Sequence, residues 1–407
     1  MTRWLSIVGI GEDGYDALTP AARNLVELAD LLVGGKRHLA MVSPSYQATM
    51  EWPSPIYSAI DKIAAEKKKN ICILATGDPF CYGIGRLIAG RIPMSKISVL
   101  PAPSAYSLAC ARLGWSIADI DMVTLHGRPN ALLTPAIQPN AKLLILSQNS
   151  ETPFDVAASL TARGFGGSEM TVLERLGGAK ERVRTALAEG WNEKDTDPLN
   201  VVAVNCKAGA SAQIQSRLAA LPDDAFTHDG QLTKQETRAA TLAALGPAPG
   251  QLLWDVGAGS GSVGIEWMRR DSRSKAIAIE TNADRLNFIA KNAIALGTPH
   301  LTIIAGKAPA VLAGLAAPDA VFIGGGLSTD GVFQASWEAL KPGGILVANV
   351  VTLESENTLF ELRKTHGGEL KRIAVSRAET VGTMTGWKPL MAVTQWCVTK
   401  PFGGATA

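Results

Sequence analysis

The stretch at residues 252–261, LLWDVGAGSG, constrains the fold more than any other part of the sequence. Residues 252–255 form an apolar run that ends in an acid, which predicts the end of a buried strand. Three alternating glycines follow, and a helix is expected at residues 262–268. Glycines at alternate positions allow a sharp turn and let a ligand approach the backbone closely. The stretch therefore predicts a ligand-binding loop at the carboxyl edge of an open α/β sheet.

Two kinds of ligand fit this loop. Gly259, Gly261 and Gly264 satisfy G-x-G-x-x-G, which is typical of dinucleotide sites. Asp255 instead favours S-adenosylmethionine (SAM), because a carboxylate suits an ammonium and a sulfonium better than a pyrophosphate. Glu280 ends a second apolar run and can accept hydrogen bonds from ribose hydroxyls. We therefore expect a methyltransferase rather than a dehydrogenase.

The composition bounds the other possibilities. The chain has 407 residues, of which 46% are hydrophobic and 19% charged, enough for two domains with sizeable cores. A net charge of +2 predicts no nucleic-acid surface. Five scattered cysteines show no metal-ligand spacing and suit a reducing compartment. Because neither a signal peptide nor a membrane span is expected, we predict a cytoplasmic protein without a membrane partner.

Predicted strands and helices alternate along both halves. In the first half, strands are expected at residues 4–10, 71–75, 97–100, 143–146, 170–173 and 201–204, and helices from residue 19 and at 82–89, 104–113 and 154–163. The periodicity lapses around residues 221–230, so we place a domain boundary between residues 222 and 223. The alternation beyond it predicts a second, mostly parallel sheet.

Three loops of the first half follow predicted strands directly. They contain Gly9 and Gly11, Thr76-Gly77-Asp78-Pro79, and Pro103-Ser104, with Ser104 as a candidate N-cap of the helix that follows. Turn chemistry can explain each loop separately. The position of all three at strand carboxyl ends favours ligand-binding loops over turn chemistry alone.

These three motifs resemble those of the tetrapyrrole methylases, the class III SAM methyltransferases. The resemblance implies two α/β lobes around a folded SAM, with cofactor contacts at Gly9, Gly11, Gly77, Asp78, Pro79 and Ser104. This chain has Glu12-Asp13-Gly14 where most of the family has Pro-Gly. Residues 125–129 and 173–177 are similar to the branch that acts late in corrin synthesis. In the first of these motifs His126 is a candidate base, or a loop histidine without a chemical role.

Residues 341–347 resemble the turn into a late strand of class I methyltransferases. The second half is similar to the decarboxylating class I precorrin methyltransferases, through residues 222–224, 229–238, 305–309, 321–326 and 394–396. The resemblance implies a Rossmann-like fold with SAM contacts at Thr233, Gly257, Ala258, Gly259, Ser260, Gly261, Glu280 and Ala308, next to Asp255. Thr233 and Glu236 also fit a capping box, with Thr233 as the N-cap, and the two roles can coexist. Residues 324–326, three glycines, leave room for a bulky planar substrate or form a flexible turn.

Together the resemblances imply a homo-oligomeric enzyme of cobalamin biosynthesis with one SAM per domain. Its substrate would be an anionic tetrapyrrole (precorrin), methylated at C5 by residues 1–222 and at C15 by residues 223–407, with loss of the ring C acetate carboxyl as CO2. Cations must bind the substrate carboxylates, and the candidates are Arg128, Lys234, Arg238 and Lys307. Candidate catalytic groups are His126, Arg128 and Lys307.

Two alternatives stay open on the sequence alone. One is an RNA or small-molecule methyltransferase with a non-catalytic N-terminal module. The other is a chain in which one half is a degenerate SAM-binding or oligomerisation module.

Overall fold

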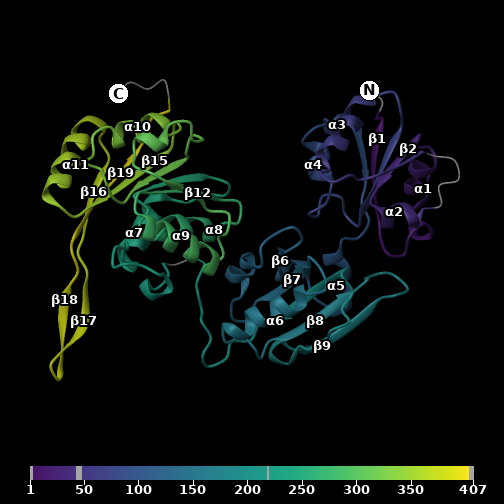
Figure 1. Ribbon diagram of the computed structural model, residues 1–407, viewed down its shortest axis with the longest axis horizontal. Helices are drawn as coiled ribbons and strands as arrows, with labels where there is room; N and C mark the ends of the chain where they lie inside the picture. Colours follow the sequence, from purple (N-terminus) through teal and green to yellow (C-terminus); the bar gives the residue numbers. More distant parts are fainter. Residues whose placement is uncertain (1–2, 43–47, 218–219, 403–407) are drawn as a thin grey trace. The chain divides into compact units, whose positions relative to one another are not determined.

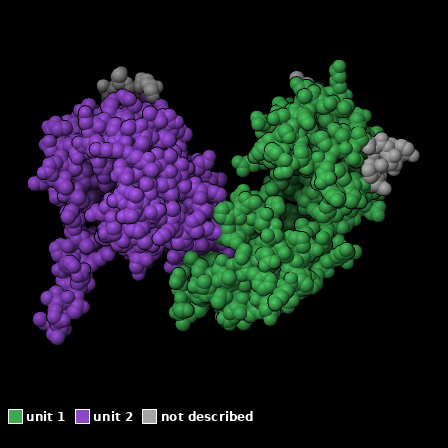
Figure 2. All heavy atoms as spheres, viewed as in Figure 1, with its two compact units in different colours: residues 1–130, 136–213 green, residues 131–135, 214–407 purple. Residues whose placement is uncertain are grey.

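The computed structural model describes residues 3–42, 48–217 and 220–402, which form two compact units (Figure 2). The first unit comprises residues 1–130 and 136–213, and the second residues 131–135 and 214–407. The units divide after residue 213, whereas the sequence predicts a boundary after residue 222. Leu221 belongs to the second unit because its side chain is buried in that core and its N–H donates to Glu266 Oε1 at 2.9 Å. Within the described ranges, no helix is both long and apolar enough to cross a membrane.

The first lobe of the first unit is built on a parallel five-stranded sheet of order β3-β2-β4-β1-β5 (Figure 1). Its strands are β1 (Leu5–Ile10), β2 (Leu31–Gly34), β3 (Ala48–Glu51), β4 (Ile71–Thr76) and β5 (Ile97–Leu100). Helices α1 (Pro20–Glu27) and α2 (Lys36–Met41) cover one face, and α3 (Tyr57–Ala65) and α4 (Gly85–Ala89) the other. The central strands β1 and β4 are apolar except at Ser6 and Thr76, as expected for parallel strands buried on both faces.

The second lobe contains a mixed five-stranded sheet of order β6-β7-β10-β8-β9. Its elements are β6 (Asp121–Thr124), β7 (Lys142–Leu146), β8 (Glu169–Glu174), β9 (Arg182–Leu187), β10 (Asn200–Asn205), α5 (Ala105–Leu113) and α6 (Thr152–Ala162). Only β6 and β7 are parallel, and the other neighbours are antiparallel. Helix α5 packs Tyr106, Ala109 and Cys110 on this sheet. The two lobes confirm the predicted two-lobed α/β architecture.

The second unit is built on a seven-stranded sheet of order β13-β12-β11-β14-β15-β19-β16. Its strands are β11 (Leu252–Val256), β12 (Lys275–Glu280), β13 (Thr302–Ala305), β14 (Ala320–Ile323), β15 (Ile345–Val350), β16 (Glu369–Ile373) and β19 (Val393–Thr399). The first five of the order are parallel, and β19 pairs antiparallel with both β15 and β16. The chain reverses direction across the sheet between β11 and β14, which creates a switch point where α/β sheets bind ligands.

Helices cover both faces of this sheet. One face is covered by α7 (Gln235–Leu245), α8 (Ser262–Arg270) and α9 (Ala283–Ala295), and the other by α10 (Val332–Ala339) and α11 (Leu353–His366). A hairpin of β17 (Ser376–Val381) and β18 (Met384–Pro389) projects away from the sheet (Figure 1). The predicted Rossmann-like, mostly parallel fold is therefore confirmed.

Candidate functional site

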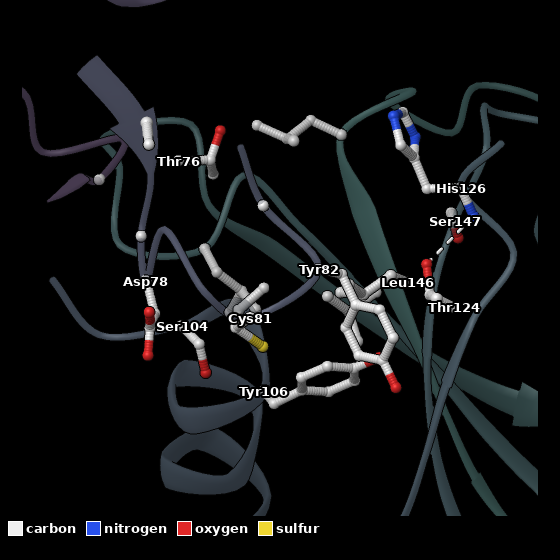
Figure 3. A pocket seen from close by; sticks show the side chains of 18 of the residues that line it. Thr76, Asp78, Cys81, Tyr82, Ser104, Tyr106, Thr124, His126, Leu146 and Ser147 are labelled. Carbon is white, nitrogen blue, oxygen red and sulfur yellow. Dashed lines mark hydrogen bonds between the residues drawn. The ribbon is translucent and has the colours of Figure 1, made fainter. Parts of the chain in front are cut away.

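A cavity of about 750 Å³ is lined by both lobes of the first unit (Figure 3). Thr76, Asp78 and Ser104 approach it from the strand ends of the first lobe, and Thr124 and His126 from the second lobe. The three loops predicted from the sequence thus meet at one site. Four of the predicted cofactor-binding residues line it: Gly11, Gly77, Asp78 and Ser104.

The three loops are held together by their backbones. The N–H of Gly77 donates to the Ile10 carbonyl at 3.0 Å, and the Gly77 carbonyl accepts from the Ala102 N–H at 3.1 Å. A Cβ at Gly9 would lie 1.9 Å from the Gly77 oxygen, so no other residue fits at position 9. Gly9 itself is behind the cavity wall, because it is the point at which the loops make contact.

Pro79, also predicted to contact the cofactor, does not line the cavity either. It is buried, and its carbonyl accepts a hydrogen bond from the Gly85 N–H at 2.9 Å, which leads the chain into α4. Asp78 lines the cavity and fixes the same turn, since its Oδ1 accepts from the Phe80 N–H at 2.8 Å. Ser104 is confirmed as the N-cap of α5, accepting from the Ser107 N–H at 3.1 Å.

An aromatic wall was not foreseen from the sequence. The Tyr82 and Tyr106 rings meet edge to face at 6.1 Å, and the Arg128 guanidinium lies 5.5 Å from the Tyr82 ring centroid. The Tyr106 hydroxyl donates to the Val123 carbonyl at 2.7 Å, and burial raises its pKa. Arg128 therefore combines a positive charge with an aromatic surface, a pairing that suits an anionic ring system. The exposed His126 lines the same cavity.

Four further lining residues were not assigned to the site from the sequence: Glu12, Arg37, His38 and Arg175. Burial and the neighbouring Arg37 charge lower the pKa of His38 to about 4, so the ring is neutral at pH 7. Its Nε2 is 2.8 Å from Thr76 Oγ1. In the sequence, the pair Gly34-Gly35 directly after an apolar run could have indicated this part of the site, since glycines at a strand end mark a close approach of the backbone.

In the second unit a cavity of about 640 Å³ lies at the carboxyl ends of β11, β12, β14 and β15. The residues predicted for this site that line it are Thr233, Lys234, Gly257, Ala258, Gly259, Glu280, Lys307, Ala308, Gly324, Gly325 and Gly326. The loop glycines Gly257, Gly259 and Gly261 have φ values of 70°, 60° and 78°, which other residues rarely adopt. The alternating glycines are therefore required by the turn itself.

The carboxylate of Glu280 connects two strand ends. Its Oε2 accepts from the Gly259 N–H at 2.8 Å, and its Oε1 accepts from the N–H groups of Thr281 at 2.8 Å and Asn282 at 3.0 Å. The side chain is thus oriented by three main-chain donors. The Thr281 hydroxyl also donates to Oε1, at 3.3 Å. Of these four bonds Oε2 accepts one, so a lone pair on Oε2 remains for a ligand hydroxyl.

Three residues predicted for this site do not line the cavity: Asp255, Ser260 and Gly261. Asp255 is 1% exposed, and its Oδ2 accepts from the Gly264 N–H at 2.8 Å. Burial, with a smaller contribution from the Glu280 charge, raises the pKa of Asp255 to about 7. Ser260 is 2% exposed, and Gly261 is the N-cap of α8. In this structure the three residues position the loop and do not form part of the cavity wall.

Two predictions about α7 are wrong. The helix begins at Gln235 with Lys234 as its N-cap and no side-chain cap hydrogen bond, so Thr233 does not form a capping box. Glu236 pairs with Arg377 instead, at 2.7 Å. Arg238 is fully buried and its Nε lies 2.6 Å from Glu266 Oε1, so it is not available to substrate carboxylates. It serves the core of the unit.

Asn349 is a lining residue that the sequence analysis missed. Its Nδ2 donates to Thr241 Oγ1 at 2.8 Å, and its Oδ1 accepts from Gln395 Nε2 at 3.1 Å. These bonds fix the amide at the edge of the cavity. An asparagine inside an apolar strand was the only sequence signal.

The chain matches known proteins along nearly its whole length. A precorrin-6Y C(5,15)-methyltransferase [decarboxylating] from Sinorhizobium sp is 47% identical over 398 residues, which cover 98% of this chain and 96% of that protein. The chain belongs to the family of the decarboxylating precorrin-6Y C5,15-methyltransferases. A member of that family from Mycobacterium tuberculosis is 39% identical over 399 residues, covering 97% of this chain and 99% of that protein.

Each half also matches a family of its own. Residues 5–190 match the tetrapyrrole (corrin/porphyrin) methylases, and residues 224–400 match the precorrin methyltransferase domain. A cobalt-precorrin-7 C(5)-methyltransferase from Salmonella typhimurium is 32% identical over 179 residues, 44% of this chain and 88% of that protein. The first half is therefore not an unrelated module, and membership of the family makes the chain a methyltransferase with SAM as methyl donor.

The residues of the second cavity fit SAM. Glu280 offers an oriented acceptor for a ligand hydroxyl, and a Cβ at Gly257 would come within 3.0 Å of the Gly325 backbone, so the loop needs glycine there. In the first cavity the glycine loops and Asp78 supply close backbone approach and a carboxylate. When bound, SAM supplies a methyl group carried on a positively charged sulfur.

Proposed function

We propose that the chain is a bifunctional enzyme of cobalamin biosynthesis that methylates precorrin-6Y at C5 and C15 and removes the ring C acetate carboxyl to give precorrin-8. The first domain would act at C5, and the second at C15 and in decarboxylation, each with its own SAM. The observation that carries the proposal is a cavity in each unit that lies at the strand ends where the sequence places SAM-type loops.

The assignment of C5 to one domain has independent support. The Salmonella C(5)-methyltransferase covers only 44% of this chain, so an enzyme named for that single activity has about the size of one half. The family matched by residues 224–400 is the precorrin methyltransferase domain, which we assign to C15. The ring C acetate lies near the C15 bridge, so one bound orientation of the substrate could serve both reactions of the second domain.

Neither methylation needs a strongly activated side chain, because the electron-rich bridging carbon of the macrocycle is itself the nucleophile. The work of the protein is then to hold the reactants close together and oriented. In the first cavity Arg128 and Tyr82 present a cationic and a flat surface. In the second, Lys234, Lys307 and Asn349 present two cations and a fixed amide.

The loss of CO2 leaves an electron pair that the conjugated macrocycle can accept. The second cavity therefore needs only to bind the acetate and the ring in a fixed orientation. Residues 324–326, all glycine, leave one wall of this cavity without side chains. That wall is where we place the macrocycle.

We also propose that the enzyme is a homo-oligomer that associates through the β17–β18 hairpin. Val381, Met384 and Trp387 on this hairpin are 64%, 74% and 78% exposed. Exposed apolar side chains gathered on one projecting element mark an association surface.

Product analysis with labelled SAM tests the main proposal. The complete chain should add two methyl groups to precorrin-6Y and release one CO2. A substitution that inactivates either cavity should abolish the addition of one methyl group only. Loss of both methyl groups from a single-cavity lesion would contradict two separate sites.

A further inference from the structure

A single carboxylate lies between two guanidinium groups in the wall of the first cavity. Glu12 Oε2 is 3.0 Å from Arg175 Nη1, and its Oε1 forms an ion pair with Arg37 Nη1. Glu12 and Arg37 belong to the first lobe and Arg175 to the second, and all three line the cavity. The cluster therefore joins the two lobes around the space that they enclose.

The two arginines are held in place by other residues. Arg175 Nε lies 2.7 Å from Asp197 Oδ2, and Asp197 is fixed in turn by the Leu199 N–H at 2.8 Å. Arg37 Nη2 donates to Thr76 Oγ1 at 3.0 Å. Because these anchors are independent of Glu12, the guanidiniums would keep their positions if the Glu12 carboxylate moved away.

The structure also makes space for Glu12. A Cβ at Gly178 would lie 2.7 Å from the Glu12 Cβ, so a larger residue at position 178 would displace it. Arg175 has a φ of 47°, a left-handed conformation that is uncommon for arginine. Such backbone strain is typical of sites at which a side chain must be aimed at a ligand.

The three side chains differ in how far they are buried. Burial lowers the pKa of Arg37, and the nearby positive charge of Arg175 lowers it further. The side chains of Arg37 and Arg175 are still 31% and 29% exposed, whereas that of Glu12 is 10% exposed. Each guanidinium has five N–H donors, of which Glu12 occupies only a part. The cluster can therefore accept a carboxylate from the cavity.

We propose that Arg37 and Arg175 bind one side-chain carboxylate of the tetrapyrrole substrate, and that Glu12 occupies this position as an internal carboxylate until the substrate replaces it. The inference rests on the proposed function of the first cavity. A carboxylate that takes the place of Glu12 keeps both guanidiniums compensated, so the exchange adds little desolvation cost. Hydrogen bonds from two arginines also distinguish a carboxylate from an ester or amide.

The competing explanation is a structural ion pair that only joins the lobes. The two explanations predict opposite effects for Glu12→Gln. A structural role makes this change harmful in the same way as loss of either arginine. If Glu12 is a stand-in for a substrate carboxylate, the change removes a competitor and strengthens substrate binding.

The test measures the KM for precorrin-6Y and the kcat of C5 methylation in the complete chain, with the SAM dissociation constant measured by calorimetric titration. Arg37→Gln and Arg175→Gln should raise KM by about tenfold or more, the loss of one charged hydrogen bond, with SAM binding unchanged. The KM values of Arg37→Lys and Arg175→Lys should lie between those of the glutamine variants and that of the unaltered chain. Glu12→Gln should lower KM. Arg112→Gln is the matched control, because Arg112 pairs with Glu181 outside the cavity.

The proposal is overturned if the arginine variants keep the original KM, or if Glu12→Gln raises KM as they do. Thermal unfolding of each variant separates a folding defect from a binding defect, and the lysine variants retain the charge where glutamine fails to fold. If the unaltered chain adds no methyl group at C5, the proposed function of the cavity fails instead. That result is distinct because it does not depend on any variant.

Discussion

Glu280 Oε2 accepts a hydrogen bond from the main-chain N–H of Gly259 at 2.8 Å, so the last residue of β12 holds the loop that follows β11. The same carboxylate lines the cavity. Ligand binding and loop conformation therefore depend on one side chain. Glu280→Ala should weaken SAM binding at the second site by about ten- to a hundredfold, as expected for the loss of charged hydrogen bonds.

Calorimetric titration of the complete chain checks this prediction, since the two SAM sites should separate into two phases in the variant. Asp284→Ala is the control, because Asp284 lies nearby on α9 and does not line the cavity. C5 methylation should survive in both variants. An equal loss of both methylations in Glu280→Ala would show that the sites are not separate.

Asp255 should make the stability of the second unit fall as pH rises. Its folded pKa of about 7 lies above the ordinary aspartate pKa of 3.8, so between these pH values the folded state retains a proton that the unfolded chain releases. The free energy of unfolding should therefore decrease through this window by at most about 1.4 kcal/mol per pH unit, and stay level above it.

Asp255→Asn removes this titration. From about pH 4 to pH 7 the free energy of unfolding of the unaltered protein should fall, whereas that of the variant lacks this decrease. The variant should therefore become more stable relative to the unaltered protein as pH rises. Denaturant unfolding at several pH values measures it, with Asp284→Asn on the exposed surface of α9 as the control. Parallel pH curves for Asp255→Asn and the unaltered protein would contradict the prediction.

Gly325→Leu should depress C15 methylation and CO2 release together. Gly325 is the suitable position, because a Cβ there meets nothing within 4 Å, whereas one at Gly324 would lie 2.8 Å from the Phe322 ring and Gly326 has a φ of +81°. The leucine should therefore fill the cavity without disturbing the loop. Mass-resolved product analysis counts added methyl groups and lost CO2.

Gly325→Ala provides the size control and should have a smaller effect. Asp78→Ala, in the first cavity, should give the reciprocal result, with C5 methylation reduced and CO2 release intact. Normal CO2 release from Gly325→Leu, or its loss in Asp78→Ala, would overturn the assignment of decarboxylation to the second domain.

The chain should separate into two folded halves if it is cut after residue 213, and a cut after residue 222 should destabilise the second half. The N–H of Leu221 donates to Glu266, and its carbonyl accepts from the buried Arg238. Removal of Leu221 leaves that buried charged pair short of partners, which costs about 1–3 kcal/mol or more. Thermal unfolding of fragments 214–407 and 223–407 compares the two cuts, and equal melting temperatures would contradict the expectation.

Trp387→Glu should reduce association of the chain. The residue is 78% exposed on the hairpin, and a charge placed in an apolar contact is unfavourable. Sedimentation velocity measures the oligomeric state. Leu353→Glu is the matched control, because Leu353 is equally exposed, at 78%, but lies on α11. A monomeric unaltered chain, or the same loss of association in both variants, would reject the hairpin as the interface.

The sequence alone determined features that depend on short stretches of chain. The loop of alternating glycines at Gly257–Gly261 was predicted from its spacing and the apolar run before it, and Ser104 was predicted as an N-cap from the residues around it. In the first unit, strands β2, β3, β6 and β9 were missed. The first three are four residues each, and β9 alternates exposed and half-buried positions, so their positions depend on neighbouring strands.

Tertiary structure alone decided which charged residues face a cavity. Arg238 and Arg37 are both arginines near predicted loops, yet the first is fully buried against Glu266 and the second lines a cavity beside Glu12. Glu12 and Arg175 are far apart in the sequence and meet only because two lobes enclose one space. Turns and caps can be predicted from local sequence because adjacent residues form them. The partner of a charge is set by the packing of distant elements, so only the folded chain shows it.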